Sequence, residues 1–197
     1  MSEEKESFRS KTSLMTLQLA GGAIFGALSI VVSFIAAFLP RTPEGFAYFD
    51  PVSIIWVLCF LIFGPLAGIL CSVIGMVGLM FFDPFAPIGP SMKFIATIPM
   101  IIVPMLLKKL YKEGEGSEKL LERKSYITVG LIAIVVRIVI MVPINIVLYI
   151  ALGFPAEGLM YWIFIVIVLN ALQGVWDWLV PYIIVKGAKL NERFEIW

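Results

Sequence analysis

Six long apolar segments constrain what this chain can fold into more than any other feature of its sequence. They cover residues 14–39, 51–64, 65–82, 91–108, 125–152 and 158–186. A helix needs about 20 apolar residues to cross a bilayer. The chain is 60% hydrophobic and 15% charged, whereas a soluble domain carries about 25% charged residues. The sequence therefore predicts an all-α integral membrane protein with six transmembrane helices in a compact bundle.

The second and third segments are shorter than the others and meet at Gly64-Pro65. This pair of residues breaks a helix and suits a tight turn. We therefore expect the two segments to form a hairpin of helices.

The lysines and arginines indicate the orientation of the chain in the membrane. Arg41 lies in a loop, and Lys93 and Arg137 fall within apolar segments. The remaining basic residues precede segment one, join segments four and five, or follow segment six: Lys5, Arg9, Lys11, Lys108, Lys109, Lys112, Lys119, Arg123, Lys124, Lys186, Lys189 and Arg193. Because basic loops stay in the cytoplasm, six spans would place both termini inside the cell.

The start of the chain does not read as a cleavable signal. The residues before the first apolar segment mix acids with bases, and the segment is longer than the apolar part of a signal peptide. We expect it to be retained as the first helix. The expected division is a cytoplasmic segment, a transmembrane domain and a cytoplasmic tail at residues 1–13, 14–187 and 188–197.

The first apolar segment contains the stretch GGAIFGALS, in which small residues are concentrated. At about 100° per residue, they form an alanine face and an adjacent face of glycines and a serine: Ala20, Ala23 and Ala27, then Gly22, Gly26 and Ser29. In lipid, small residues let two helix backbones approach closely. This flat surface fits tight packing within the chain, or docking against a second membrane protein.

Two opposite charges are predicted at similar depth in the bilayer. At about 1.5 Å of rise per residue, Arg137 lies roughly 17 Å from the inner end of segment five, and Asp177 roughly 14 Å from that of segment six. An unpaired charge there costs several kcal/mol. We expect a structural ion pair, with a transport role as the alternative.

Four further polar side chains are predicted nearer the outer face, namely Lys93, Asn145, Asn170 and Gln173. Amide donors and acceptors with one ammonium suit a polar organic ligand. Alternatively, the amides form hydrogen bonds between helices, and the Lys93 side chain reaches to the membrane surface.

The outer loops are rich in Pro, Gly and aromatic residues. They form either rigid turns at the membrane interface or a cover over an outward-facing pocket. Tyr48 and Phe49 are accordingly either interfacial aromatic residues or ligand contacts. Asp50 and Asp83 precede prolines, where helix caps are common, or they pair with Lys93.

The sequence offers no catalytic or metal-binding constellation. It contains no histidine, and no nucleophile–base pair or nucleotide-binding loop is visible. Cys59 and Cys71 lie in apolar runs and are expected to be buried as small hydrophobic residues. The net charge of +1 does not suggest nucleic acid as a partner. We expect no enzymatic activity, no metal and no cofactor.

The pattern of six helices with both ends inside and a small-residue first helix resembles one family, the membrane-embedded substrate-binding subunits (S components) of energy-coupling factor vitamin transporters. In that family an Ala-x-x-x-Ala pattern on helix one meets the transmembrane coupling subunit. Ala23 and Ala27 match that pattern. The resemblance implies a docking surface on the first helix: Ala20, Gly22, Ala23, Gly26 and Ala27.

Two stretches in the first half of the chain are similar to the riboflavin-type members. FDPVSIIWVLCFLIFGPLAGIL resembles their segment ending in Gly-Pro-x-x-Gly, here Gly64, Pro65 and Gly68. IGPSMKFIAT resembles their Gly-x-x-x-Asn-Phe stretch, with Lys93 where asparagine is usual.

Two stretches in the second half show the same similarity. RIVIMVPINIVLYIALGF resembles their helix five and places Asn145 at the ligand-facing asparagine. LNALQGV resembles their Asn-x-x-Lys-Gly stretch, with Asn170 matching and Gln173 in place of the lysine. The family's lysine is thus absent from the last helix, while Lys93 adds one on helix four.

The resemblance implies a multi-pass protein of a prokaryotic plasma membrane that captures a vitamin from outside. A transmembrane coupling subunit and two cytoplasmic ATPases would be its partners, with lipid around it. Riboflavin is the first candidate ligand, and a carboxylate-bearing nutrient such as pantothenate is the alternative that Lys93 suggests. A non-transport assembly protein remains the other reading.

Overall fold

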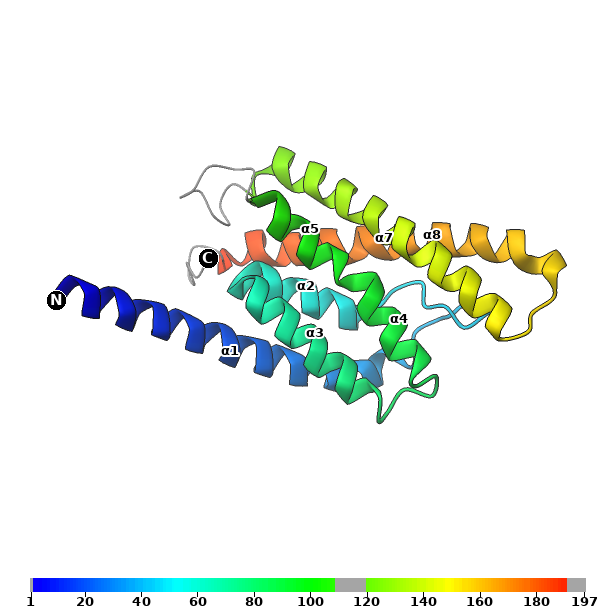
Figure 1. Cartoon of the computed structure of the whole chain (residues 1–197), viewed down its shortest axis with the longest axis horizontal. Coiled ribbons are helices and arrows are strands. Elements are labelled where there is room, and N and C mark those ends of the chain that lie inside the picture. Colours follow the sequence, from blue (N-terminus) through cyan, green and yellow to red (C-terminus); the bar gives the residue numbers. More distant parts are fainter. Residues whose placement is uncertain (1, 109–119, 191–197) are drawn as a thin grey trace.

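The computed structural model describes residues 2–108 and 120–190, and for residues 2–12 and 108 it describes the backbone alone. Every regular element within these ranges is a helix (Figure 1). In chain order they are α1 (Ser2–Ala36), α2 (Pro51–Phe63), α3 (Pro65–Leu79), α4 (Ile88–Thr97), α5 (Pro99–Lys108), α7 (Arg123–Ala151), the short 3₁₀ helix η1 (Ala156–Gly158) and α8 (Leu159–Gly187).

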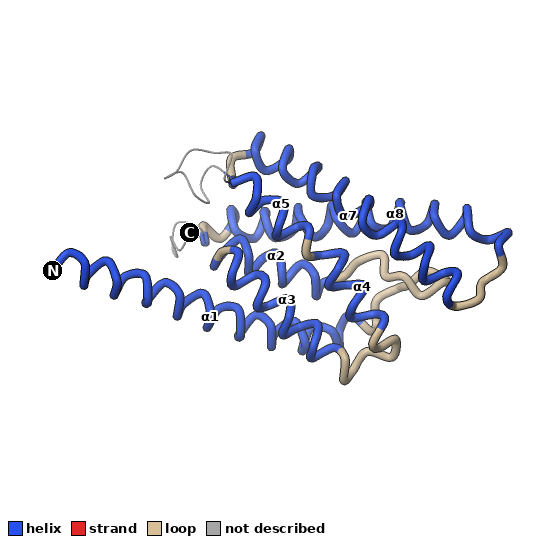
Figure 2. The backbone as a smooth tube through the Cα atoms, viewed as in Figure 1, coloured by secondary structure: helices blue, strands red, loops and turns tan. Residues whose placement is uncertain are grey.

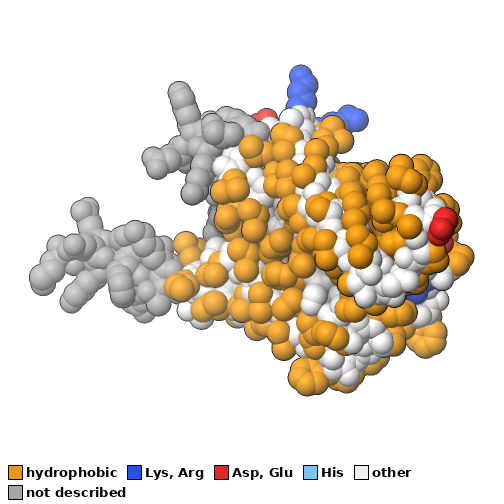
Figure 3. Space-filling view, turned by 45° about the vertical axis from the view of Figure 1, so that its right-hand side comes forward, with side chains coloured by type: hydrophobic (Ala, Val, Ile, Leu, Met, Phe, Trp, Pro, Cys, Tyr) orange, Lys and Arg blue, Asp and Glu red, His pale blue; other side chains and the backbone are white. Residues whose placement is uncertain are grey.

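Among the described residues, four stretches of helix are long and apolar enough to cross a membrane: Ser13–Ala36, Ile88–Leu107, Arg123–Ala151 and Ala156–Gly187. Their outward surface is apolar, with Val139, Val147 and Ile183 all more than half exposed. Figure 3 shows such a surface, with charged side chains gathered toward its margins. Exposed apolar surface on this scale requires lipid as the solvent. The chain is therefore an all-α membrane protein, as its composition predicts.

The two remaining apolar helices, α2 and α3, have 13 and 15 residues and are shorter than a full span. All of α2 except Pro51 and Leu58 is buried, so protein rather than lipid surrounds it. A helix that is apolar on every side fits this central position. The chain reverses at Gly64, whose φ of 97° favours glycine, and Pro65 begins α3. The expected hairpin of helices is present.

The helices pack in two groups that α2 joins. α1 lies against α2 and α3, while α7 packs against α5 and α8, and α2 also contacts α8. Tyr126 and Trp178 hold α7 to α8 through stacked rings with centroids 4.3 Å apart. The Tyr126 hydroxyl donates to the Trp178 carbonyl oxygen, and the Trp178 indole N–H donates to the Tyr126 carbonyl oxygen.

The helix order brings the start of α1 and the end of α8 to one end of the bundle, together with the end of α5 and the start of α7 (Figure 1). We call this the terminal end. The loops that connect α1 to α2, α3 to α4 and α7 to α8 lie at the opposite end, the loop end (Figure 2). Arg123, Lys124 and Lys186 belong to the terminal end, in the first turn of α7 and the last turn of α8.

Part of the charge pattern that predicts orientation lies outside the described residues. This holds for the expected loop at 109–119, for the tail at 191–197, and for eight basic side chains: Lys5, Arg9, Lys11, Lys108, Lys109, Lys112, Lys119 and Arg193.

The glycine face of α1 is buried inside the chain. A Cβ atom added to Gly22 would lie 3.1 Å from Leu70 Cβ on α3, and one added to Gly26 would lie 2.8 Å from Ile74 Cβ. Ser29 on the same face is fully buried. The expectation that Gly22 and Gly26 belong to a docking surface is therefore wrong, because α3 already occupies that face.

The alanine face of α1 has the opposite environment. Ala20, Ala23 and Ala27 are all exposed, and the large side chains of Ile24 and Val31 beside them are 66% and 60% exposed. The small residues thus serve two purposes. The glycines permit close packing on α3, and the alanines lie on the outside of the bundle, where Ile24 and Val31 project beside them.

Candidate ligand-binding site

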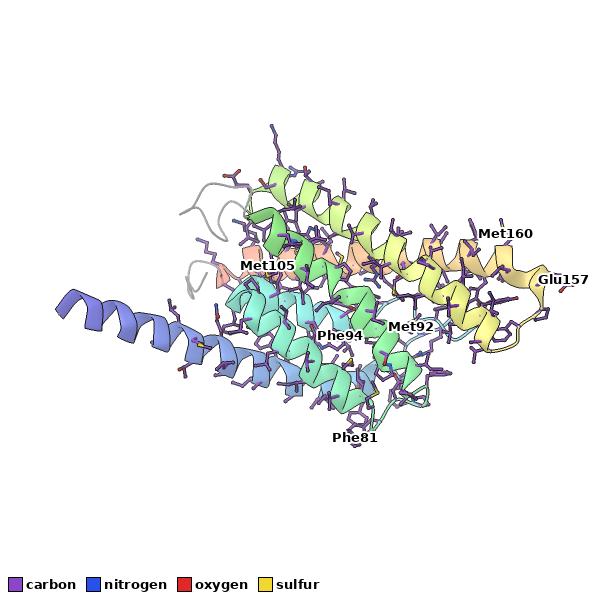
Figure 4. The ribbon with its side chains drawn as sticks, viewed as in Figure 1. Phe81, Met92, Phe94, Met105, Glu157 and Met160 are labelled. Atoms are coloured by element: carbon purple, nitrogen blue, oxygen red, sulfur yellow. The ribbon has the colours of Figure 1, made fainter. Side chains whose placement is uncertain are left out.

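A cavity of about 740 Å³ lies toward the loop end of the bundle. Its walls come from the loop before α2 and the first turn of α2, from the loop before α4 and the length of α4, and from the facing sides of α7 and α8. Met92 lines it from α4, whereas Phe94 on the same helix packs toward the core (Figure 4). Ligand pockets have volumes of about 300–1,000 Å³, so this cavity has the size of a binding site for a small molecule.

Helical spacing explains which side chains reach the cavity from α7 and α8. Residues spaced by three or four positions share one face of a helix. Each helix presents one such stripe to the cavity, made up of Arg137, Met141, Asn145, Leu148 and Leu152 on α7, and of Trp162, Asn170 and Gln173 on α8.

The inner part of the cavity is formed by a polar cluster around Arg137, which we call the floor network. Three polar residues of α8 converge on this guanidinium. Its Nε donates to Asn170 Oδ1 (3.1 Å), its Nη1 to Asp177 Oδ2 (2.6 Å) and its Nη2 to Gln173 Oε1 (2.9 Å). Ser53 of α2 completes the network by donating to Asp177 Oδ1 at 2.6 Å.

The ion pair expected between Arg137 and Asp177 is present and almost fully buried, with side chains 2% and 0% exposed. Both carboxylate oxygens of Asp177 accept hydrogen bonds, and three of the nitrogens of Arg137 donate. Removing one partner of a buried pair costs about 3–5 kcal/mol, because an unpaired charge is left behind. The floor network therefore holds α2, α7 and α8 in register.

The same network settles how the amides of Asn170 and Gln173 are used. Their acceptor oxygens bind Arg137, Asn170 Nδ2 donates to the Val166 carbonyl oxygen at 2.8 Å, and Gln173 Nε2 donates to the carbonyl oxygen of Ala47 in the loop before α2. Sequence reasoning leaves these amides open between ligand contacts and interhelical hydrogen bonds. In the structure both line the cavity, and their polar atoms form interhelical and local hydrogen bonds.

Lys93 forms an ion pair with Asp50, one of the partners that the sequence offers for it. Its Nζ lies 2.8 Å from Asp50 Oδ2, and the two side chains are 18% and 10% exposed. Asp50 Oδ1 meanwhile accepts from the Val52 N–H and caps α2. Asp50 therefore performs both roles that its position suggests. The Asp83 carboxylate accepts from the Phe85 N–H instead.

Asn145 differs from the other amides of the cavity. It is 2% exposed, and its Nδ2 donates to the Met141 carbonyl oxygen on its own helix at 2.8 Å. Its Oδ1 is buried and has no hydrogen-bond partner among the residues that the structure describes. Leaving a buried acceptor unpaired costs about 1–3 kcal/mol. Asn145 thus combines a place in the cavity lining with a buried acceptor that lacks a partner among the described residues.

Aromatic side chains form the wall near the loop end. Trp162 of α8 packs against Phe46, Phe154 and Tyr149, with ring centroids 5.1, 5.7 and 5.3 Å away. Tyr149 is fixed by donating to the Pro155 carbonyl oxygen. The indole N–H of Trp162 is buried and is unpartnered within the described part of the chain. This wall therefore combines flat apolar surface with one free donor.

The loop before α2 supplies the charged rim of the cavity. Arg41 donates to the Gly45 carbonyl oxygen, and its guanidinium lies 5.9 Å from the centre of the Phe85 ring. Hydrogen bonding to its own backbone lowers the pKa of Glu44, which keeps this carboxylate ionised at neutral pH. Glu44 Oε1 accepts from the Tyr161 hydroxyl, whereas Oε2 is buried and unpartnered in the described ranges.

Tyr48 and Phe49 lie outside the cavity lining, so the cavity does not support the prediction that they contact a ligand. Tyr48 is 43% exposed, and the Phe49 ring meets Trp176 edge to face at 6.0 Å on the outer side of α8. These positions fit the alternative reading of interfacial aromatic residues. Phe46, a few residues earlier in the same loop, is the aromatic residue of this loop that lines the cavity.

Two kinds of cavity-lining residue are not predicted from the sequence. Trp162 precedes Asn170 by eight positions and so shares its face of α8, a signal that helical spacing could have supplied. Glu44 and Phe46 lie in an irregular loop, where no periodicity reports which side chain turns inward. Their place in the site depends on the tertiary position of the loop.

The fold and the site together define a class: an all-α membrane protein with a ligand-sized cavity between its helices near one end. Comparison with known proteins adds no family, since no family model and no curated protein matches the chain.

Proposed function

We propose that this protein is the membrane-embedded substrate-binding subunit of an energy-coupling factor importer, and that it captures a small vitamin from outside the cell. The observation that carries the proposal is the cavity of about 740 Å³ at the loop end, with buried polar atoms that lack partners among the described residues. A structural cavity would be filled or satisfied. Riboflavin is the first candidate ligand, because the chain resembles the riboflavin-type members of that family.

The topology that this function requires has six spans, with both termini in the cytoplasm. The arrangement of the helices supports it, since the start of α1, the end of α8 and the described basic residues Arg123, Lys124 and Lys186 lie at the terminal end (Figure 1). Under the positive-inside rule the terminal end then faces the cytoplasm, and the loop end with the cavity faces outward. α2 and α3 complete the six segments as a hairpin of two short helices.

The alanine face of α1 is the proposed docking site for the transmembrane coupling subunit, which two cytoplasmic ATPases would drive. Ala20, Ala23 and Ala27 are exposed on a helix that contacts mainly α2 and α3. Small residues allow a partner helix to approach closely, and the exposed Ile24 and Val31 beside them add apolar contact area. The protein itself would perform no chemistry.

The first test is purification of the protein from its membrane, followed by absorbance and mass spectrometry of any bound small molecule. We expect a vitamin to co-purify, and a flavin spectrum would identify riboflavin. A ligand-free protein that binds no vitamin would instead favour a role in membrane assembly.

The docking role is tested with the double variant Ala23→Phe/Ala27→Phe. Bulk on this face should abolish vitamin uptake and leave ligand binding intact, because the cavity lies elsewhere. Val139→Phe is the matched control, since Val139 is 66% exposed on α7, away from α1. Unchanged uptake in the double variant would contradict the docking surface.

A further inference from the structure

We propose that the cavity selects an uncharged or cationic molecule with hydrogen-bond donors and discriminates against anions. This inference rests on the proposed ligand-binding function and adds the chemical class of the ligand. It is argued from the ionic partners of the lining residues and from the polar atoms left open.

The two inner cations of the cavity are already matched by carboxylates. Lys93 is paired with Asp50 at 2.8 Å, and Arg137 is paired with Asp177 at 2.6 Å. A bound carboxylate or phosphate would have to displace one of these pairs, and in a buried site this leaves an unpaired charge at a cost of several kcal/mol. Lys93 therefore does not provide the anion site that its sequence position suggests.

The rest of the lining adds no surplus of positive charge. Among its described residues, the cations and the carboxylates are equal in number: Arg41, Lys93 and Arg137, against Glu44, Asp50 and Asp83. Arg41, the cation outside the two pairs, is exposed at the rim, where it donates to Gly45 and lies over Phe85. An anion thus meets a site without net attraction.

The atoms left open favour a donor on the ligand. Asn145 Oδ1 is a buried acceptor and Trp162 Nε1–H a buried donor, both on residues of the cavity lining and both without partners in the described ranges. A ligand N–H or O–H group would satisfy the amide oxygen, and a ligand carbonyl oxygen or ring nitrogen would satisfy the indole. A cation would also gain from Glu44 and from the aromatic wall.

The test is calorimetric binding to the purified protein in lipid nanodiscs, with four probes. Riboflavin is neutral, riboflavin 5′-phosphate adds an anionic group to the same molecule, thiamine is cationic and pantothenate is anionic. We expect riboflavin or thiamine to bind, and both anionic probes to bind at least about tenfold more weakly, which corresponds to about 1.4 kcal/mol.

Variants at Asn145 test the atom that the inference assigns. Asn145→Ala removes the open acceptor and should weaken the bound probe about tenfold. Val147→Ala, on the outward face of the same helix and 67% exposed, is the control and should bind as the unsubstituted protein does. Size-exclusion elution of each variant confirms that it remains folded.

The outcomes distinguish a failure of the charge selection from a failure of the proposed transport function. Equal or tighter binding of pantothenate or riboflavin 5′-phosphate overturns the charge selection and leaves the transport function standing. Unchanged binding in Asn145→Ala overturns the role of that acceptor. If no probe binds and no small molecule co-purifies, the proposed function itself fails. If a different molecule co-purifies, its charge, read by mass spectrometry, supports or overturns the inference directly.

Discussion

The floor network and the outer part of the cavity are built from similar side chains in opposite states. In the floor network, Asn170, Gln173 and Asp177 all bind the guanidinium of Arg137. Farther toward the loop end, Asn145 Oδ1 and the Trp162 N–H are equally buried but have no partner in the described ranges. The side-chain oxygen of Asn170 thus accepts a hydrogen bond, whereas that of Asn145 has no partner in the described ranges.

This difference distinguishes polar residues that stabilise the fold from polar residues that are available for binding. Buried polar groups that satisfy one another fix the relative positions of the helices. A buried group without a partner costs stability. The floor network thus stabilises the helix packing, and the outer cavity holds the polar groups that the proposed function would use for recognition.

Asp177→Asn is the variant with the largest expected effect, and it tests whether the floor network stabilises the fold. The change keeps the shape of the side chain but leaves Arg137 as an uncompensated buried charge, so we expect the free energy of unfolding to fall by about 3–5 kcal/mol. At about 2–4 °C per kcal/mol, the melting temperature in detergent should fall by roughly 6–20 °C.

The control and the coupled variant make that prediction specific. Asp83→Asn, at a carboxylate that accepts from the Phe85 N–H, should change stability by less than about 0.5 kcal/mol. Arg137→Met/Asp177→Asn should be less destabilised than Asp177→Asn alone, because no buried charge remains. Wild-type stability in Asp177→Asn together with lost uptake would mean that the pair serves transport rather than structure.

Lys93→Met tests whether the second ion pair belongs with the structural group. Asp50 would lose its partner while still capping α2, and because the pair is partly exposed we expect a loss of about 2 kcal/mol in stability. Affinity for riboflavin or thiamine should change by less than about threefold. A much larger loss of affinity with unchanged stability would place Lys93 among the ligand contacts.

The sequence predicts the ion pair of the floor network but not its other members. Helix rise is fixed, so estimated depth brings Arg137 and Asp177 together. Asn170 and Gln173 are predicted nearer the outer face, whereas in the structure both accept from Arg137. Apolar length likewise predicts the helices. The state of Asn145 depends on which atoms surround it in three dimensions, and Glu44 lies in a loop without periodicity. The sequence also does not predict which face of α1 is buried, because helical spacing separates the glycine and alanine faces but does not indicate which of them contacts α3.

The smallest expected effect comes from Trp162→Phe, which tests whether the indole N–H of the outer cavity binds the ligand. Phenylalanine keeps the contacts with Phe46 and Phe154 but removes the indole N–H, which is open among the described residues. Because one neutral hydrogen bond contributes about 1 kcal/mol, the bound probe should weaken about fivefold. Stability without ligand should hold to within about 1 kcal/mol, since the smaller ring loses packing while an unsatisfied donor disappears. Calorimetric titration and a melting curve measure the two quantities on the same sample. If affinity were unchanged, the indole N–H would not bind the ligand, and Trp162 would contribute only apolar surface to the cavity.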